Sequence, residues 1–174
     1  HPFDLITILQ EQYESLDFNE AQRQRTVMMY KPHDEFKPWD GIDPNEPTLN
    51  KCAFIKTNAE DMKGQMFDDL QYVGGRDFFC NLLYHHMARD SVIRERAPQI
   101  LENIEKQGIQ DMICFHDECY GFYASYCPRN NIELPEGFNP IHVFEYVYNY
   151  LKDHESEIEK LNIKAAYQRN CSTR

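Results

Sequence analysis

The clearest pattern of apolar positions lies in the second half of the chain. The stretch from Glu105 to Gly108 is typical of a helix end, with glycine just past the last turn, and the apolar run from Ile109 to Phe115 follows at once. This order predicts a helix that leads into a buried strand. Helical spacing then resumes from His116 to Cys127.

Further along, Pro128 to Pro140 is typical of a loop, and Ile141 to Leu151 has the apolar face of a helix. The short apolar run from Ile163 to Tyr167 predicts another strand. Strand, helix and strand in this order favour right-handed parallel units. We therefore expect an α/β fold, with a parallel sheet and flanking helices.

The middle of the chain predicts one more strand and three helices. Ala53 to Lys56 is the strand candidate, and Asn58 is a good N-cap for the amphipathic run after it. Gly74-Gly75 breaks that pattern before a helix expected from Asp77. Ser91 is expected to cap the next helix, which contains Pro98.

The first fifty residues have a different character. Residues 3–16 and 21–30 have roughly helical spacing, whereas Lys31 to Lys51 contains four prolines and favours an irregular connector. We therefore expect residues 1–50 to form a helical and Pro-rich N-terminal extension and residues 51–174 to form one cysteine-rich α/β unit.

Composition and charge restrict the class of partner. The chain has 174 residues, 41% of them hydrophobic, which suits one ordinary core. Its formal net charge of -11 disfavours nucleic acid and anionic membranes as partners. No apolar window is long enough for a membrane span, and the N-terminus lacks a signal-peptide pattern. We expect a soluble, cytoplasmic protein with protein partners.

The cysteines carry the candidate chemistry. Their density is below that of secreted disulfide scaffolds, so in a reducing compartment they are expected to be buried thiols or metal ligands. An even number does not settle the choice, because six thiols can also pair in fifteen ways. The six are Cys52, Cys80, Cys114, Cys119, Cys127 and Cys171.

The strongest local signal is the sequence around Cys114, His116 and Cys119. These residues lie at the end of the expected buried strand, and ligands of parallel sheets gather at the carboxyl ends of strands. His116 and Cys119 are three positions apart and would point the same way on a helix. Thiolate and imidazole suit a soft metal. Parallel topology would bring Cys80 and Cys171 to the same edge.

These segments resemble the cysteine-rich CCG domain of the family that includes heterodisulfide reductase and the iron–sulfur subunit of glycolate oxidase. The resemblance is carried by three stretches: 103–123, 140–145 and 164–174. It implies an iron–sulfur cluster and electron transfer to or from thiols, disulfides or quinone-linked partners, with other subunits of a redox complex as partners.

Position by position, Phe79-Cys80-Asn81 stands where the family has Cys-Cys-Gly, and Cys114 keeps the expected interval. The closing Cys-x-x-Cys keeps its spacing only as His116 to Cys119. Cys171 would open a second repeat that is cut off here, and Cys52 stands near the first family cysteine. These departures leave open a cluster with fewer thiolates, one completed by His116, or no metal.

Two rival functions remain open at this point. The first is a cluster-free structural or docking domain of a redox complex. The second is a zinc-stabilised domain with Cys80, Cys114, His116 and Cys119 as ligands. Nothing in the sequence indicates a hydrolase or a kinase, and whether the chain acts as an enzyme subunit stays open.

Other cysteine and histidine residues have plainer interpretations. Cys127, before Pro128, is expected to be structural. The pair His85-His86 is expected to be one core and one surface histidine, because adjacent helical residues diverge. His142 is expected to pack or to form a hydrogen bond at a helix start.

Overall fold

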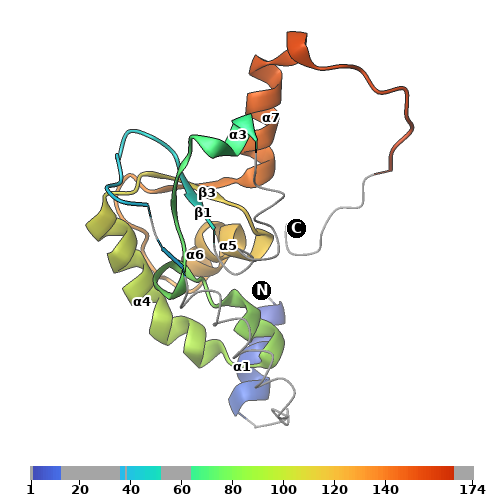
Figure 1. Cartoon of the computed structure of the whole chain (residues 1–174). Helices are drawn as coiled ribbons and strands as arrows, with labels where there is room; N and C mark the ends of the chain where they lie inside the picture. The colour runs from blue at the N-terminus through green and yellow to red at the C-terminus, as the bar shows by residue number, and fades with distance from the viewer. Residues whose placement is uncertain (1, 13–35, 38, 52–63, 167–174) are drawn as a thin grey trace.

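The computed structural model describes residues 2–12, 36–37, 39–51 and 64–166. Their centre is a sheet of four parallel strands in the order β2-β1-β3-β4 (Figure 1). Helices flank the sheet, so the expected α/β fold is confirmed. The strands are β1 (Thr48–Asn50), β2 (Gln71–Val73), β3 (Asp111–Cys114) and β4 (Asn139–His142).

The strand order places a topological switch point in the middle of the sheet. The chain passes from β1 to β2 on one side and then crosses to β3 on the other side of β1. At such points in parallel α/β sheets the connections leave in opposite directions, and ligand sites are often found beyond the carboxyl ends of the central strands. Asn50 ends β1 and Cys114 ends β3, and the two are register partners.

Two hydrophobic clusters cover the two faces of the sheet. The larger cluster contains Met112 and Cys114 of β3 together with residues of the helices that follow β2 and β3 in the sequence. The smaller one contains Leu49, Ile113 and Val143. Figure 1 shows α7 and α3 beside each other and apart from α4. The helices on the larger cluster are η2 (Leu82–Met87), α4 (Asp90–Gln107), α5 (Asp117–Gly121), η3 (Phe122–Tyr126) and α6 (Cys127–Arg129), and those on the smaller one are α3 (Gln65–Asp68) and α7 (Val143–Asp153).

The segment from α4 to β3 folds as its sequence predicts. Ile93, Ile100 and Ile104 lie on one face of α4 and are fully buried, while Pro98 lies inside the helix without ending it. Gly108 closes the helix with φ 68°, a left-handed conformation that glycine adopts without steric cost. Strand β3 then begins within the predicted apolar run.

Strand β1 lies where the sequence predicted an irregular connector. The prediction missed it because it has only three residues and follows Pro44 and Pro47. The side chain of Gln71 holds the start of this strand: its Nε2 donates to Thr48 Oγ1 at 2.9 Å and to Asp43 O at 2.7 Å. Strand β1 thus belongs to the sheet although it precedes the boundary expected at residue 50.

Three other expectations differ from the structure. The helix expected from Asp77 is replaced by two 3-10 segments, η1 (Arg76–Phe78) and η2. Strand β4 spans the end of the expected loop and the start of the expected helix, and its Pro140 is tolerated because β4 is an edge strand. Residues 163–166 form no strand, and Ile163 is 70% exposed and pairs with no strand of the described residues. The candidate strand Ala53 to Lys56 and the helix expected over residues 21–30 lie outside the described residues.

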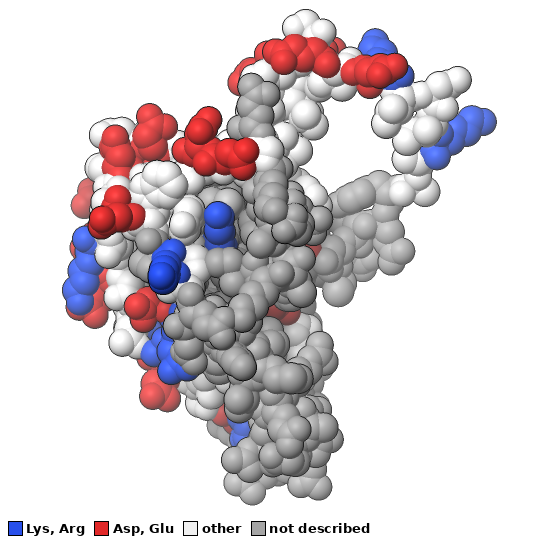
Figure 2. Space-filling view, in the orientation of Figure 1, with Lys and Arg blue, Asp and Glu red and all other residues white. Residues whose placement is uncertain are grey.

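Helix α1 (Pro2–Gln12) packs against α4 and η2. Within the part of the chain that is described, no helix combines the length and the apolar character needed to cross a membrane. Acidic side chains gather around the end of α7 and the 3-10 segment η4 (Glu155–Glu157) after it (Figure 2).

Candidate thiol site at the carboxyl edge of the sheet

The candidate site lies at the switch point, where β1 and β3 end side by side. Successive residues of a strand point to opposite faces. Asn50 therefore shares a face with Met112 and Cys114, whereas Leu49 and Ile113 point to the face that α7 covers. The last side chains of both central strands are thus an amide and a thiol directed into the larger cluster.

Two more thiols reach this cluster from other elements. Cys119 lies on α5, the short helix after β3, and is fully buried. Cys80 lies in the connection between η1 and η2 and is 2% exposed. Cys80, Cys114 and Cys119 are all buried thiols in one hydrophobic cluster. Segments far apart in the sequence therefore bring three thiols to one face of the sheet.

The side chain of Asn50 connects these segments. Its Nδ2 lies 3.4 Å from Cys119 Sγ, 3.5 Å from Met112 Sδ and 3.3 Å from Phe78 O. Phe78 ends η1 two residues before Cys80, so this amide touches both η1 and α5. Asn50 itself is fully buried.

The other end of this amide has no partner among the described residues. Asn50 Oδ1 is buried and accepts no hydrogen bond from them. A buried unsatisfied acceptor costs about 1–3 kcal/mol. Rotating the amide by 180° would not remove the problem, because the oxygen would then face the carbonyl oxygen of Phe78 and the donors to both sulfurs would be lost.

The backbone beside Cys80 adopts a conformation that favours glycine. Asn81 has φ 60° in the left-handed region. Asparagine tolerates this region better than most residues. Its Nδ2 donates to Phe79 O at 2.6 Å, and Leu82 N donates to Cys80 Sγ at 3.5 Å.

Two histidines form hydrogen bonds with carboxylates of α5, the helix that carries Cys119. His142, the N-cap of α7, accepts a hydrogen bond from Phe144 N at its Nδ1. The proton of a neutral ring is then on Nε2, which donates to Asp117 Oδ1 at 3.1 Å. The hydrogen bond that His86 Nε2 forms with Glu118 Oε1 at 3.0 Å raises the pKa of His86.

The predicted ligands that the structure describes are not arranged to hold a metal ion. Over residues 64–166 and the earlier described segments, no three His, Cys, Asp or Glu side chains lie close enough to hold an ion. The expected convergence of Cys80, Cys114, His116 and Cys119 on one ion is therefore not observed. His116 differs most from expectation: its side chain is a third exposed and lies 3.8 Å from Glu118. Cys52 and Cys171 lie outside the described residues.

Cys127 lies in the same hydrophobic cluster as the other three described thiols. It is fully buried, and burial raises the pKa of its thiol to about 12. The π-helical segment η3 precedes it and turns Phe122, Tyr123 and Tyr126 into the core. A single π turn inside a helix is often found beside functional sites, and here it lies between Cys119 and Cys127.

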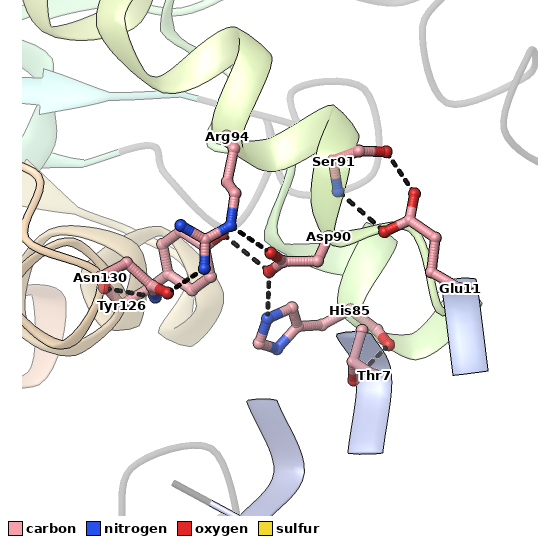
Figure 3. A network of polar contacts seen from close by, with 8 residues as sticks. All are labelled: Thr7, Glu11, His85, Asp90, Ser91, Arg94, Tyr126 and Asn130. Carbon is pink, nitrogen blue, oxygen red and sulfur yellow. Dashed lines mark hydrogen bonds and ion pairs between the residues drawn. The ribbon is translucent and has the colours of Figure 1, made fainter. Parts of the chain in front are cut away.

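A separate buried network surrounds Asp90 on the same side of the sheet (Figure 3). The carboxylate is 3.2 Å from His85 Nε2 and accepts hydrogen bonds from Tyr126 Oη at 2.8 Å and from Arg94 Nε at 2.5 Å. Burial, reinforced by the hydrogen bond from Tyr126 to Asp90, holds the pKa of Tyr126 far above its usual value. The neighbouring contacts of Thr7 with His85 O and of Glu11 with Ser91 fasten α1 to the same place.

The comparisons with known proteins identify no relative: no protein-family model, no curated protein and no solved structure matches this chain.

Asn50 is the residue that the sequence did not single out. It lies in Leu49-Asn50-Lys51-Cys52, a polar residue two positions before a cysteine. The nearby prolines hid the strand that carries it. The only sequence signal was the pattern apolar–amide–Lys–Cys after Pro47, which is too short to be specific.

Proposed function

We propose that this chain is an electron-transfer domain that binds an iron–sulfur cluster at the carboxyl edge of its sheet. Cys80, Cys114 and Cys119 would hold iron, together with thiols outside the described residues such as Cys52 or Cys171. The observation that carries the proposal is the burial of three thiols from separate segments in one hydrophobic cluster on one face of the sheet.

The chemistry of these residues suits such a cofactor. Iron–sulfur clusters are held by cysteine thiolates and are tuned by burial and by hydrogen bonds to sulfur. The site offers buried thiols and an amide N–H directed at one of them. The left-handed Asn81 beside Cys80 agrees with the glycine of the CCG pattern, which is further support.

In this role the residues of the chain would bind the cluster and shield it from water, and they would do no acid–base chemistry. A cluster held by Cys80, Cys114 and Cys119 would supply one-electron redox chemistry, so full reduction of a disulfide or of a quinone-linked partner would take two successive electrons and two protons. The apolar side chains around the thiols, among them Met112 and Phe122, would exclude water from the site. Solvent exclusion and burial are two of the means by which proteins set a cluster's potential.

A second candidate function is a docking domain without a cluster. It is favoured by an apolar stripe on α7, in which Phe144 is 63% exposed, Tyr148 is 65% exposed and Leu151 is 41% exposed. These residues are spaced by four and three positions and so lie along one side of the helix. A partner with an apolar surface would fit this stripe.

The test is anaerobic reconstitution of the 174-residue chain with ferrous iron and sulfide, followed by iron, sulfide and zinc analysis and visible absorption. We expect the wild type to bind iron and sulfide, and Cys119→Ala to lose most of both. Cys127→Ala is the matched control, because this thiol is equally buried in the same cluster but is not an expected ligand.

Three other outcomes would contradict the proposal. A colourless wild type with one equivalent of zinc would support the zinc-stabilised domain. A wild type with no metal would favour the docking function. Equal iron loading of the Cys119→Ala and wild-type chains would show that the cluster, if present, lies elsewhere.

A further inference from the structure

We propose that the exposed side of α7 binds a basic amphipathic helix of a partner protein. The apolar stripe, formed by Phe144, Tyr148 and Leu151, makes the hydrophobic contact. The acidic side chains that follow it along the chain attract the lysines and arginines of the partner. This inference rests on the docking function of α7 and holds with or without a bound cluster.

The other side of α7 is already committed to the fold. Val143 is buried, and Tyr146 and Val147 pack against the smaller hydrophobic cluster. Tyr146 Oη also donates a hydrogen bond to Met66 O at 2.9 Å, which ties α7 to α3. Rotating α7 to bury the apolar stripe would expose Val143 and break this bond, so the stripe stays available for a partner.

Both ends of α7 are fixed as well. At its start, Phe144 N donates to His142 Nδ1 at 3.1 Å. At its end, the rings of Tyr150 and His154 stack with their centroids 4.1 Å apart. A preformed surface loses little conformational freedom on binding, so more of the contact energy remains as affinity.

The spacing of the apolar stripe fits a second helix. Its residues are four and three positions apart, which is the spacing along which two helices interdigitate their side chains. An extended segment presents its side chains at a period of two and matches this spacing less well. The element that contacts α7 is therefore a helix with apolar residues at the same intervals.

The charge next to the stripe indicates which kind of helix binds. Acidic side chains begin at the last residue of α7 and continue through η4 (Figure 2). Residues 153–159 contain no lysine or arginine. Acids at the carboxyl end of a helix are unfavourable, because the helix dipole is negative there, and a cationic partner would offset this cost. The acidic cluster consists of the exposed Asp153, Glu155, Glu157 and Glu159.

A second copy of this chain fits the apolar stripe less well than a basic partner. Each chain has a formal net charge of -11, so two copies repel one another. Charge complementarity instead favours a partner helix with an excess of lysine and arginine.

The test uses the metal-free 174-residue chain and a designed peptide as the probe. The probe is a labelled helix of about 20 residues, with leucines spaced by three and four positions and lysines beside them. A second peptide has glutamate in place of every lysine. Fluorescence anisotropy should give a Kd of micromolar order for the lysine peptide and binding at least about tenfold weaker for the glutamate peptide.

The first variants remove the apolar stripe. Phe144→Ser combined with Tyr148→Ser should weaken binding of the lysine peptide by about tenfold or more, because buried aromatic side chains dominate interface energies. Tyr148→Ser alone is a milder version. Leu5→Ser is the matched control, because Leu5 is 59% exposed on α1, which packs against α4. Circular dichroism and thermal unfolding check that each variant folds.

The second variants separate the acidic cluster from the net charge. Changing its three glutamates to glutamine should weaken binding by about tenfold at about 0.01 M salt and little at about 1 M, where the Debye length is only about 3 Å. The control removes the same charge from exposed glutamates of α4, and equal losses in both triple variants would overturn the role of the acidic cluster. The control positions are Glu95, Glu102 and Glu105.

The remaining outcomes distinguish this inference from the functions proposed above. If the glutamate peptide binds as tightly as the lysine peptide, docking survives but the basic partner is ruled out. If neither peptide binds, or the stripe variants bind like the wild type, both the inference and docking at α7 fail. A dimer in analytical ultracentrifugation that Phe144→Ser with Tyr148→Ser dissociates would assign the stripe to a second copy. None of these results bears on the cluster, which the iron reconstitution tests separately.

Discussion

Asp90 and Asn50 are both buried polar residues beside the same hydrophobic layer, and the fold treats them in opposite ways. Asp90 has partners from η2, from its own helix α4 and from η3. The donor of Asn50 is shared among three acceptors, and its acceptor has no partner among the described residues. A charged group cannot stay buried without compensation, whereas a neutral amide can be left partly unsatisfied at a modest cost.

The difference teaches where to look for function in this molecule. A network in which every member is satisfied rigidifies the fold, and the Asp90 network joins the elements that it touches. A half-satisfied amide among sulfur atoms stabilises little by itself, so a structural role explains it less well. Substitutions at the two positions should therefore differ in kind.

The largest effect is expected at Asp90. Asp90→Ala leaves Arg94, His85 and Tyr126 without their shared acceptor, and should lower the free energy of unfolding by about 3 kcal/mol. The melting temperature should fall by about 6–12 °C. Urea and thermal denaturation measure both, and the exposed Asp40→Ala is the control, with a change within about 0.5 kcal/mol. Equal effects of Asp90→Ala and Asp40→Ala on the free energy of unfolding would contradict the structural role of Asp90.

A smaller effect is expected at Asn81, beside Cys80. Because its φ is 60°, Asn81→Gly should be more stable than Asn81→Ala by about 1 kcal/mol. Asn103 on α4 provides the control, because in a helix the order reverses and alanine is favoured by about 1 kcal/mol. Chemical denaturation of the four variants measures the reversal, and the same order at both positions would exclude the left-handed conformation at Asn81.

The effect of Asn50→Leu on the metal-free protein should be smaller still. It removes a hydrogen bond to Phe78 O but also removes the unsatisfied oxygen, so the free energy of unfolding should change by less than about 1 kcal/mol. Urea denaturation of this variant beside Asp90→Ala compares the two residues directly. A loss as large as that at Asp90 would assign Asn50 to the structural framework.

The smallest effect is expected at the exposed rim. The hydrogen bond from His86 to Glu118 raises the pKa of His86, so Glu118→Gln should return that pKa toward about 6.5. A raised folded pKa stabilises the protein fully below the unfolded pKa, and this contribution is lost as pH rises through the folded pKa. For so exposed a pair it is below about 0.5 kcal/mol. NMR titration of His86 between about pH 5 and 8 measures the shift, and an unchanged midpoint in Glu118→Gln would contradict it.

Local patterns predicted some elements and missed others for physical reasons. The path from α4 through Gly108 into β3 was predictable, because a long amphipathic helix, a glycine C-cap and an apolar run are all local signals. Strand β1 and strand β4 were missed because each is short and has prolines before or inside it. The apolar run from Ile163 resembled a strand, but a strand forms only where a neighbour offers hydrogen bonds.

For the candidate site, the sequence predicted that Cys114 and Cys119 lie at the end of a buried strand and that Cys80 comes from another segment, and all three lie in one hydrophobic cluster. It also placed His116 with them, whereas the side chain lies at the rim near Glu118. A spacing of three positions puts two side chains on one side of a helix only if both are inside it. Helix α5 begins at Asp117, so His116 precedes it.

By itself, the sequence determined that this protein has a parallel α/β fold and that Cys114 lies at the end of a buried strand, because periodicity and capping are properties of neighbouring residues. Only the tertiary structure decided which strands adjoin, and hence that Asn50 pairs with Cys114 and touches the sulfur of a residue 69 positions away. Strand order depends on the packing of the whole chain, and no short segment encodes it.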